Sequence, residues 1–328
     1  MKNITLYLFL NLLYVIAFAQ KPNVVEISNA HSVCDSSYYE ALVFNNQHVW
    51  FLGKHGVITQ LKDNQISSIN YPSNGSNILS AAQIDKHHYI LTGDKGTIFF
   101  YDAINNKWTN LVLTKYKTSS LYSVWVINDK EIIICGGKSK IARSEKAIPN
   151  GFIIRSEDGG KNWKRVYHSV FNMAWRINTN PTSHQLFVNL YHPNKSMLIS
   201  SSDYGKTWKK TKIKSKGIIH DFFISEQHTL MVGGPNIKQR KQAYAEFNKV
   251  PLILPDIGFI WDVNCANNTL VLACGKSYLA YKNLNEKEWK TIKLNETENR
   301  NIYKTVYVGN NTHYAYGSGK KIYKITFE

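Results

Sequence analysis

One eight-residue pattern, Ser-x-Asp-x-Gly-x-x-Trp, occurs twice in this chain and constrains its fold more than any other feature. The copies are S-E-D-G-G-K-N-W (156–163) and S-S-D-Y-G-K-T-W (201–208), and their aspartates are 45 residues apart. In such a pattern the Asp side chain accepts backbone N–H bonds in a tight turn, Gly takes a positive φ, and Trp packs beneath the turn. We therefore interpret eight residues as structural: Ser156, Asp158, Gly160, Trp163, Ser201, Asp203, Gly205 and Trp208.

Glycines that end an apolar run recur at a similar interval. They stand at Gly53, Gly93, Gly136, Gly275 and Gly317. The long gap after Gly136 holds two more units, one around position 189 without the glycine and one at 233. Each unit reads as four short strands separated by turns, without a sustained helical period. Four strands recurring every 40–50 residues are typical of a β-propeller.

Counting the strand sets predicts an all-β chain with a single propeller of seven four-stranded blades over residues 20–328. The expected blades are 31–72, 76–114, 119–168, 171–214, 217–254, 258–294 and 300–328. The last has only three strands, so the segment Asn23–Ser28 is expected to supply the fourth and to close the ring. Six or eight blades stay open as alternatives, because the fifth unit is the least regular.

The chain begins with one Lys, an apolar run and then Ala17-Phe18-Ala19. A charged start, an apolar run and an A-x-A site are typical of a signal peptide, which we assign to residues 1–19. No later stretch is apolar enough to span a bilayer. The sequence therefore predicts an exported protein, periplasmic or extracellular.

The formal net charge of +17 favours acidic partners. Export argues against nucleic acid, which leaves an acidic protein surface or an acidic polysaccharide. General enrichment in Lys is the alternative explanation of the charge. The oligomeric state stays open, and a monomer is compatible with the sequence. Four Cys permit up to two disulfides. With a turn at residues 266–269, Cys265 should face Leu270 and Cys274 should face Trp261, a geometry that disfavours a bridge between the two cysteines. No metal-ligand cluster, phosphate loop or dinucleotide fingerprint occurs, so neither metal nor cofactor is expected.

The two Trp-containing turns resemble the Asp-box, or BNR, repeats of sialidase-like propellers. The elements G-K-H-G-V-I (53–58) and G-D-K-G-T-I (93–98) are more similar to the photosystem II stability and assembly factor group, which also occurs as exported propellers. The resemblance covers nearly the whole chain after the signal and implies fold far more than activity. The sialidase active-site pattern is missing, because no Arg precedes Arg143 and the Arg at 176 lacks the expected Pro.

The resemblance also implies where a ligand would bind. In such propellers the first strand of each blade lines the central channel, and the loops between second and third strands open on its ligand face. Aligning first strands on their turns places these residues in one register: Glu40, Ser80, Ser123, Met173, His220, Trp261 and Lys304. Asp221 and Asp262 follow one step on, and Arg176 three steps on. A His beside carboxylates suits acid–base chemistry, although a wet channel also contains polar residues without any function.

The loops between second and third strands of blades 3–5 carry basic residues with interleaved Tyr and His. We call this set the basic rim: Lys138, Lys140, Arg143, Tyr191, His192, Lys238, Arg240 and Lys241. Together with Trp261 and Lys304 it forms the predicted ligand site, although long surface loops are often polar without binding anything.

Two functions fit these observations. The first is a non-catalytic binding or assembly-factor-like module that recognises an acidic protein or glycan. The alternative is a polysaccharide lyase or glycosidase acting on uronic-acid polymers. Its catalytic candidates are His192, His220, Asp221, Asp262 and Arg176, and Tyr191 and Lys304 could assist them.

Overall fold

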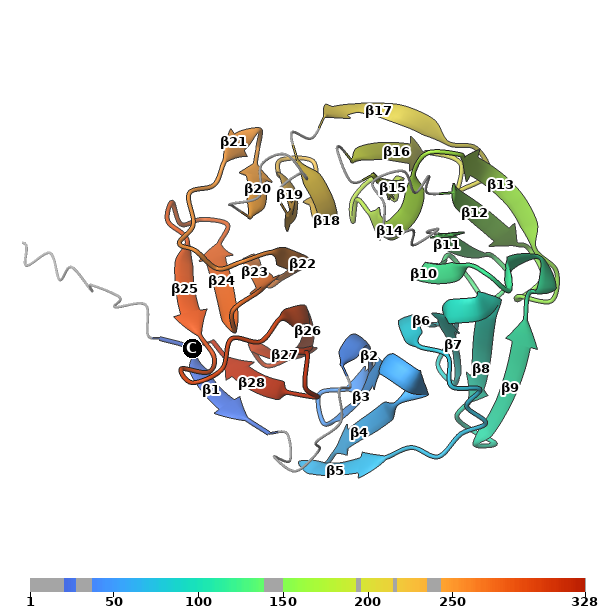
Figure 1. Cartoon of the computed structure of the whole chain (residues 1–328), viewed down its shortest axis with the longest axis horizontal. Coiled ribbons are helices and arrows are strands. Elements are labelled where there is room, and N and C mark those ends of the chain that lie inside the picture. Colours follow the sequence, from blue (N-terminus) through green and yellow to red (C-terminus); the bar gives the residue numbers. More distant parts are fainter. Residues whose placement is uncertain are drawn as a thin grey trace, which may run out of the picture.

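Seven four-stranded antiparallel sheets form a ring about a central axis, with the first strand of each blade innermost (Figure 1). The computed structural model describes residues 21–27, 37–138, 150–192, 196–214, 217–234 and 243–327. The predicted seven-bladed all-β propeller is confirmed, and six or eight blades are excluded. No described helix is long and apolar enough to cross a bilayer.

The first four blades follow one another along the chain. Blade 1 contains β2 (Tyr38–Asn45), β3 (His48–Gly53), β4 (Ile58–Lys62) and β5 (Gln65–Ser68), with the 3-10 turn η1 (Lys54–Gly56). Blade 2 contains β6 (Ile78–Gln83), β7 (His88–Gly93), β8 (Thr97–Asp102) and β9 (Lys107–Val112), with η2 (Asp94–Gly96) and η3 (Thr114–Tyr116). Blade 3 contains β10 (Ser120–Val126), β11 (Ile132–Lys138), β12 (Asn150–Ser156) and β13 (Lys164–Ser169). Blade 4 contains β14 (Met173–Thr179), β15 (Leu186–Tyr191), β16 (Met197–Ser201) and β17 (Lys209–Lys214).

The remaining blades complete the ring. Blade 5 contains β18 (Ile218–Ile224), β19 (Thr229–Gly234), β20 (Tyr244–Phe247) and β21 (Val250–Pro251). Blade 6 contains β22 (Ile260–Ala266), β23 (Thr269–Cys274), β24 (Tyr278–Asn283) and β25 (Lys290–Lys293). Blade 7 contains β26 (Ile302–Gly309), β27 (Thr312–Gly317), β28 (Ile322–Thr326) and the N-terminal β1 (Asn23–Glu26).

Blade 7 closes the ring as predicted, because its outer strand comes from the other end of the chain. Asn23 pairs with Thr326 and Glu26 with Tyr323, so β1 lies antiparallel to β28. The two segments lie side by side in Figure 1, next to the C-terminus. This pairing covers an edge that would otherwise be open to pairing with another chain.

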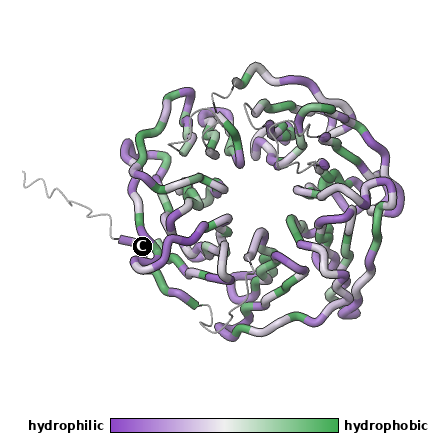
Figure 2. The backbone as a smooth tube through the Cα atoms, in the orientation of Figure 1, coloured by the Kyte–Doolittle hydropathy of each residue, from purple (hydrophilic) through white to green (hydrophobic). Residues whose placement is uncertain are grey.

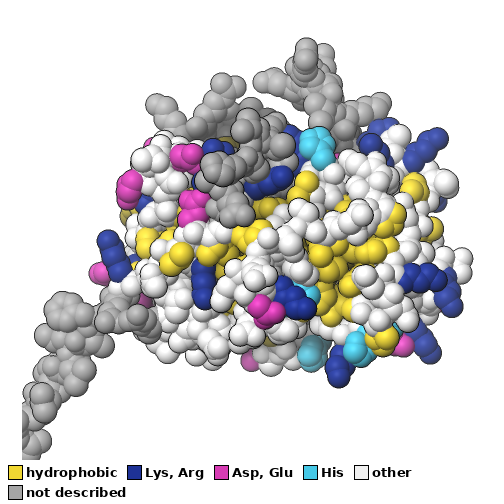
Figure 3. Space-filling view, turned by 90° about the horizontal axis from the view of Figure 1, so that it is seen from below, with side chains coloured by type: hydrophobic (Ala, Val, Ile, Leu, Met, Phe, Trp, Pro, Cys, Tyr) yellow, Lys and Arg dark blue, Asp and Glu magenta, His cyan; other side chains and the backbone are white. Residues whose placement is uncertain are grey.

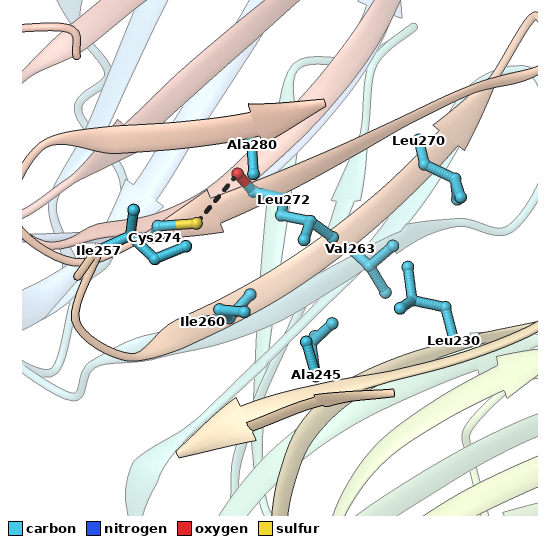
Figure 4. Packing of buried hydrophobic residues seen from close by; sticks show 10 residues of the cluster. Leu230, Ala245, Ile257, Ile260, Val263, Leu270, Leu272, Cys274 and Ala280 are labelled. Atoms are coloured by element: carbon cyan, nitrogen blue, oxygen red, sulfur yellow. Dashed lines mark hydrogen bonds between the residues drawn. The ribbon is translucent and has the colours of Figure 1, made fainter. Parts of the chain in front are cut away.

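Apolar side chains of adjacent blades pack face to face and make the core, and hydrophobic segments recur in every blade around the ring (Figure 2). The interface of blades 5 and 6 is an example, with Leu230 of β19 and Ala245 of β20 facing Ile260 and Val263 of β22 (Figure 4). The Cys274 thiol lies in the same cluster and donates a 3.5 Å hydrogen bond to the Leu272 carbonyl (Figure 4).

The cysteines described by the structure are all unbridged. Cys265 pairs with Leu270 and Cys274 with Ile260, and both thiols are free together with that of Cys135. The sequence had placed Cys274 opposite Trp261, which is wrong by one residue because β22 contains a bulge there. Cys34 lies outside the described residues.

The two Trp-containing turns connect third to fourth strands and have the expected hydrogen bonds. Asp158 Oδ1 accepts the Asn162 N–H at 2.8 Å, and Asp203 Oδ1 accepts the Thr207 N–H at 2.9 Å. Gly160 has φ +88°, a conformation that favours glycine. These turns lie at the end of the ring where first strands finish, which we call the turn face.

Candidate functional site

Every first strand carries a β-bulge at the same place, near its start. In β2, for instance, Tyr38 pairs with Gly53 and Glu40 with Leu52, which leaves Tyr39 as the extra residue. Bulges turn a side chain out of the regular alternation of a strand. The seven extra residues, which we call the mouth residues, are Tyr39, Leu79, Tyr122, Trp175, His220, Trp261 and Tyr303. They lie at the end of the ring opposite the turn face, and all are partly exposed.

Six of the mouth residues carry rings, and these rings contact one another around the axis. Their centroid distances are 4.5 Å for Tyr122–Trp175, 4.7 Å for His220–Trp261, 5.3 Å for Trp261–Tyr303 and 5.8 Å for Tyr303–Tyr39. Tyr191 bridges the one gap, at 5.6 Å from Trp175 and 6.3 Å from His220. An aromatic arc therefore runs from blade 3 through blades 4, 5, 6 and 7 to blade 1.

The residue after each bulge is polar in all seven blades. This inner ring consists of Glu40, Ser80, Ser123, Arg176, Asp221, Asp262 and Lys304. Four members accept a backbone N–H of the next blade: Ser80 from Val124, Ser123 from Ile177, Asp221 from Val263 and Asp262 from Thr305, at 3.1–3.3 Å. The inner ring thus joins neighbouring blades, which is a structural role.

The other three members, Glu40, Arg176 and Lys304, form an ion-pair network across the axis together with Asp221 and Asp262. The Arg176 guanidinium lies 3.6 Å from Asp221, 3.9 Å from Asp262 and 3.9 Å from Glu40, although these residues come from four different blades. Lys304 Nζ lies 2.6 Å from Glu40 Oε1. Three carboxylates therefore surround two cations in a largely buried cluster.

Burial changes the protonation of two residues in this region. Burial, with the nearby Asp221 carboxylate, raises the pKa of Asp262 well above its ordinary value. Burial lowers the pKa of His220 to about 4, and the Arg176 charge adds to this effect while Asp221 opposes it. The imidazole is therefore neutral at pH 7.

Two ring nitrogens of the mouth have no hydrogen-bond partner among the described residues. They are His220 Nδ1 and Trp261 Nε1, both buried. Their rings contact each other edge to face, and Phe259 stands beside both at 6.1 and 5.5 Å. A buried N–H without an acceptor costs about 1–3 kcal/mol. This part of the mouth is therefore lined by aromatic rings but also contains ring nitrogens that lack a hydrogen-bond partner among the described residues.

The structure brings together most of the predicted channel residues, but in a corrected register. Arg176, Asp221 and Asp262 share the level of Glu40, Ser80, Ser123 and Lys304, whereas the sequence alignment had put Met173, His220 and Trp261 there. The error in blade 4 comes from its longer first turn, which runs from Asn180 to Gln185. The error in blades 5 and 6 arises because β2 and β26 each have a second bulge.

The basic rim is only partly described. Lys138 is exposed at the end of β11, and Tyr191 and His192 are half-buried next to the mouth. Lys140, Arg143, Lys238, Arg240 and Lys241 lie outside the described residues. On the side of the ring that Figure 3 shows, Lys and Arg side chains are scattered among other types and do not gather in one patch.

Sequence reasoning missed most of the aromatic arc. Tyr39, Tyr122, Trp175, Tyr303 and Phe259 were not among the predicted site residues. The available signal was a large residue directly before the polar residue of each first strand, as in Y-E (39–40), W-R (175–176) and Y-K (303–304). An alignment on this pair, in place of the turns, would have found both rings.

Comparison with known proteins supports the fold and nothing finer. No family model and no curated protein matches the chain. Among solved structures, "YCF48 bound to D1 peptide" is similar over 94% of this chain and 96% of its own, with 11% identity and a TM-score of 0.68. YCF48 from Cyanidioschyzon merolae is similar over 92% and 98%, again with 11% identity and a TM-score of 0.68.

A third similar structure is the extracellular domain of the putative hybrid two-component system BT4673 from B. thetaiotaomicron. It has 11% identity and a TM-score of 0.65, over 92% of this chain and 39% of that one. At such identities the likeness establishes the fold alone. The chain is thus a seven-bladed β-propeller, similar in fold to the two YCF48 structures.

Proposed function

We propose that this chain is an exported, non-catalytic binding module of the assembly-factor type. It recognises an acidic protein or glycan partner on the face that contains the mouth residues and the described part of the basic rim. A protein of the same fold, YCF48, has been solved with a bound D1 peptide, which supports a polypeptide partner. The Ser-x-Asp-x-Gly-x-x-Trp turns support placing the chain among Asp-box propellers.

The observation that carries this proposal is the ion-pair network at the axis. A uronate lyase needs free cations to neutralise the substrate carboxylate and a proton-transferring group within reach. Arg176 is instead surrounded by Glu40, Asp221 and Asp262, and Lys304 is paired with Glu40. Paired charges that also join the blades serve architecture, so the network favours binding over catalysis.

Export is part of the proposal and rests on the N-terminal sequence, with cleavage near Ala19. The described fold starts at residue 21, and β1 begins at Asn23. Cleavage at this point would leave β1 intact and able to close blade 7. N-terminal sequencing of the protein from the exported fraction tests the cleavage site.

The function is tested by incubating the protein without residues 1–19 with polygalacturonate, heparin and poly-glutamate. Retention and cleavage are both followed, the latter as new reducing ends and unsaturated-uronate absorbance. We expect salt-sensitive retention without cleavage. Turnover that is abolished by His220→Ala or His192→Ala would contradict this proposal and support the alternative, a polysaccharide lyase or glycosidase.

The basic rim is tested with Lys138, Lys140, Arg240 and Lys241 all changed to Ser. We expect weaker retention of poly-glutamate and an unchanged fold. The matched control changes four exposed lysines near the turn face to Ser: Lys161, Lys164, Lys206 and Lys209. Equal losses in both variants would mean that bulk charge, not the rim, holds the probe.

A further inference from the structure

We propose that the mouth binds one uncharged, bulky side chain, aromatic or aliphatic, from a polypeptide partner, and that a neighbouring backbone carbonyl accepts the Trp261 N–H. This inference rests on the proposed binding function and names the chemistry of the segment that enters the mouth. It concerns only described residues, so it does not depend on the basic rim.

The shape and surface of the mouth favour an apolar anchor. Aromatic rings from blades 3 to 7 and blade 1 are partly exposed and surround one axis, and Phe259, 43% exposed, extends the arc outward. Tyr and Trp are the residues most enriched where one protein buries a side chain of another. Rigid rings lose little conformational entropy on binding, which adds to this advantage.

The charges beneath the mouth favour an uncharged anchor. Glu40, Asp221 and Asp262 oppose Arg176 and Lys304, and burial with the nearby Asp221 favours the protonated form of Asp262. With one carboxyl protonated, the cluster is close to neutral. An acidic anchor would find both cations already paired, and a basic anchor would find Arg176 and Lys304 near it, so either charge would be buried without a partner.

The unpaired ring nitrogens point to an acceptor beside the apolar group. Trp261 Nε1 can only donate, and it has no acceptor among the described residues. His220 Nδ1, in a neutral imidazole, can donate or accept according to the tautomer. A peptide offers carbonyl oxygens on both sides of any side chain, which an isolated hydrocarbon does not. The combination therefore fits a polypeptide segment.

The probe is a phage-displayed library of random 12-residue peptides, selected on the protein and counter-selected on Trp261→Ala. We expect the enriched peptides to share one Phe, Tyr, Trp, Leu or Met. A synthetic peptide of that sequence is then titrated by calorimetry, together with versions carrying Ala, Lys or Glu at the shared position. We expect all three replacements to weaken binding at least about tenfold.

Three variants of the protein assign the site. Trp261→Ala and Tyr303→Ala should each weaken the peptide at least about tenfold, and Trp261→Phe by a few fold, because it keeps a ring but loses the N–H. The matched control is Tyr204→Asn, since Tyr204 is an exposed aromatic residue of the turn face. It should bind as the parent does. Thermal melts verify that each variant is folded. If Trp261→Ala does not fold, Tyr303→Ala tests whether the peptide binds at the mouth.

Several results would overturn the inference. They are a shared charged residue in the enriched peptides, peptides that bind Trp261→Ala and Tyr303→Ala as well as the parent, or no enrichment at all. Binding of cellohexaose or chitohexaose at the mouth without peptide enrichment would assign a neutral glycan instead. If poly-glutamate is still retained through the basic rim in these cases, the proposed function stands and only the anchor is wrong.

Discussion

The two ends of the ring treat the same residue type in opposite ways. On the turn face, Trp163 and Trp208 donate their indole N–H to the Gly160 and Gly205 carbonyls at 2.9 and 3.1 Å. At the mouth, Trp261 Nε1 finds no acceptor in the part of the chain that the structure describes. The two Ser-x-Asp-x-Gly-x-x-Trp turns are thus complete in themselves, whereas Trp289 Nε1, in the corresponding connection of blade 6, shares with Trp261 the lack of an acceptor among the described residues. At the mouth this unpaired N–H lies among partly exposed aromatic rings.

This difference separates what holds the fold from what could bind a partner. Residues whose polar groups are all paired contribute to stability and have nothing left for a ligand. Positions at which hydrogen bonding or packing is left incomplete in an otherwise consistent fold tend to be functional. The network of Arg176 lies between the two cases: its guanidinium is within 3.6–3.9 Å of carboxylates from three other blades, but its Nε has no hydrogen-bond partner among the described residues.

The largest expected effect comes from Arg176→Ala, which would leave three buried carboxylates with one cation. We expect the free energy of unfolding at pH 7 to fall by about 3–5 kcal/mol. Urea denaturation measures it, with the exposed Lys138→Ala as control. A loss below about 1 kcal/mol would mean that the cluster is solvated and that the mouth is open to charged ligands.

Trp163→Ala tests the completeness of the turn face. The ring is half-buried and packs with the core cluster of blades 2 and 3, so we expect a loss of about 2–3 kcal/mol in urea denaturation. Tyr204→Asn, on the same face but exposed, should change stability by less than about 0.5 kcal/mol. Similar values for the two variants would show that the turn does not depend on its Trp.

The stability contributions of Asp262, beneath the mouth, and Asp158, on the turn face, should depend on pH in opposite directions. The pKa of Asp262 is raised in the folded state, so its contribution is present below the ordinary value of 3.8 and is lost as pH rises through the raised value. Between pH 4 and pH 8 the free energy of unfolding should therefore fall less in Asp262→Asn than in the parent, by more than about 1 kcal/mol. Hydrogen bonds from Asn162 lower the pKa of Asp158 to about 2. Its contribution to stability is therefore lost only as pH falls from 3.8 toward 2.

The pH test uses urea denaturation at several pH values. Asp158→Asn is the matched control, and it should leave the slope between pH 4 and pH 8 unchanged. An unchanged slope in Asp262→Asn would show that Asp262 is ionised in the folded protein, and the mouth would then carry a net negative charge.

The smallest and sharpest test is a pair of Trp→Phe changes. Trp163→Phe should cost about 1 kcal/mol because the Gly160 carbonyl loses its donor. Trp261→Phe should cost less, or even stabilise the protein, because it removes a buried N–H without an acceptor. A larger loss at Trp261 would mean that its N–H is satisfied in the folded protein.

The fold could be predicted because its signals are local. Turn chemistry at Asp158 and Asp203 and the recurring glycines each depend on a few adjacent residues, and together they place seven blades and the closing strand correctly. At Gly53, for example, an added Cβ would lie 1.9 Å from the Ser37 carbonyl. The bulged first strand comes that close, so the position requires glycine.

The site could be predicted only in part because it depends on counting along β-strands. A shift of one residue exchanges the two faces of a strand, and here second bulges in β2 and β26 moved the register of their blades. Glu40 and Lys304 were thus aligned with His220 and Trp261 in place of Asp221 and Asp262. The contact of Arg176 with three other blades has no local signature at all.

The closing strand also determines how the molecule would respond to force. In β1 and β28, Asn23 faces Thr326, so residues leading to both ends of the chain leave the sheet at the same edge. Tension applied through the two termini would open this pair from that edge, one residue pair after another, rather than slide whole strands past each other. Tethers at both ends would therefore load the weakest mechanical direction of the ring, whereas a tether at one end alone would leave the pair of β1 and β28 unstressed.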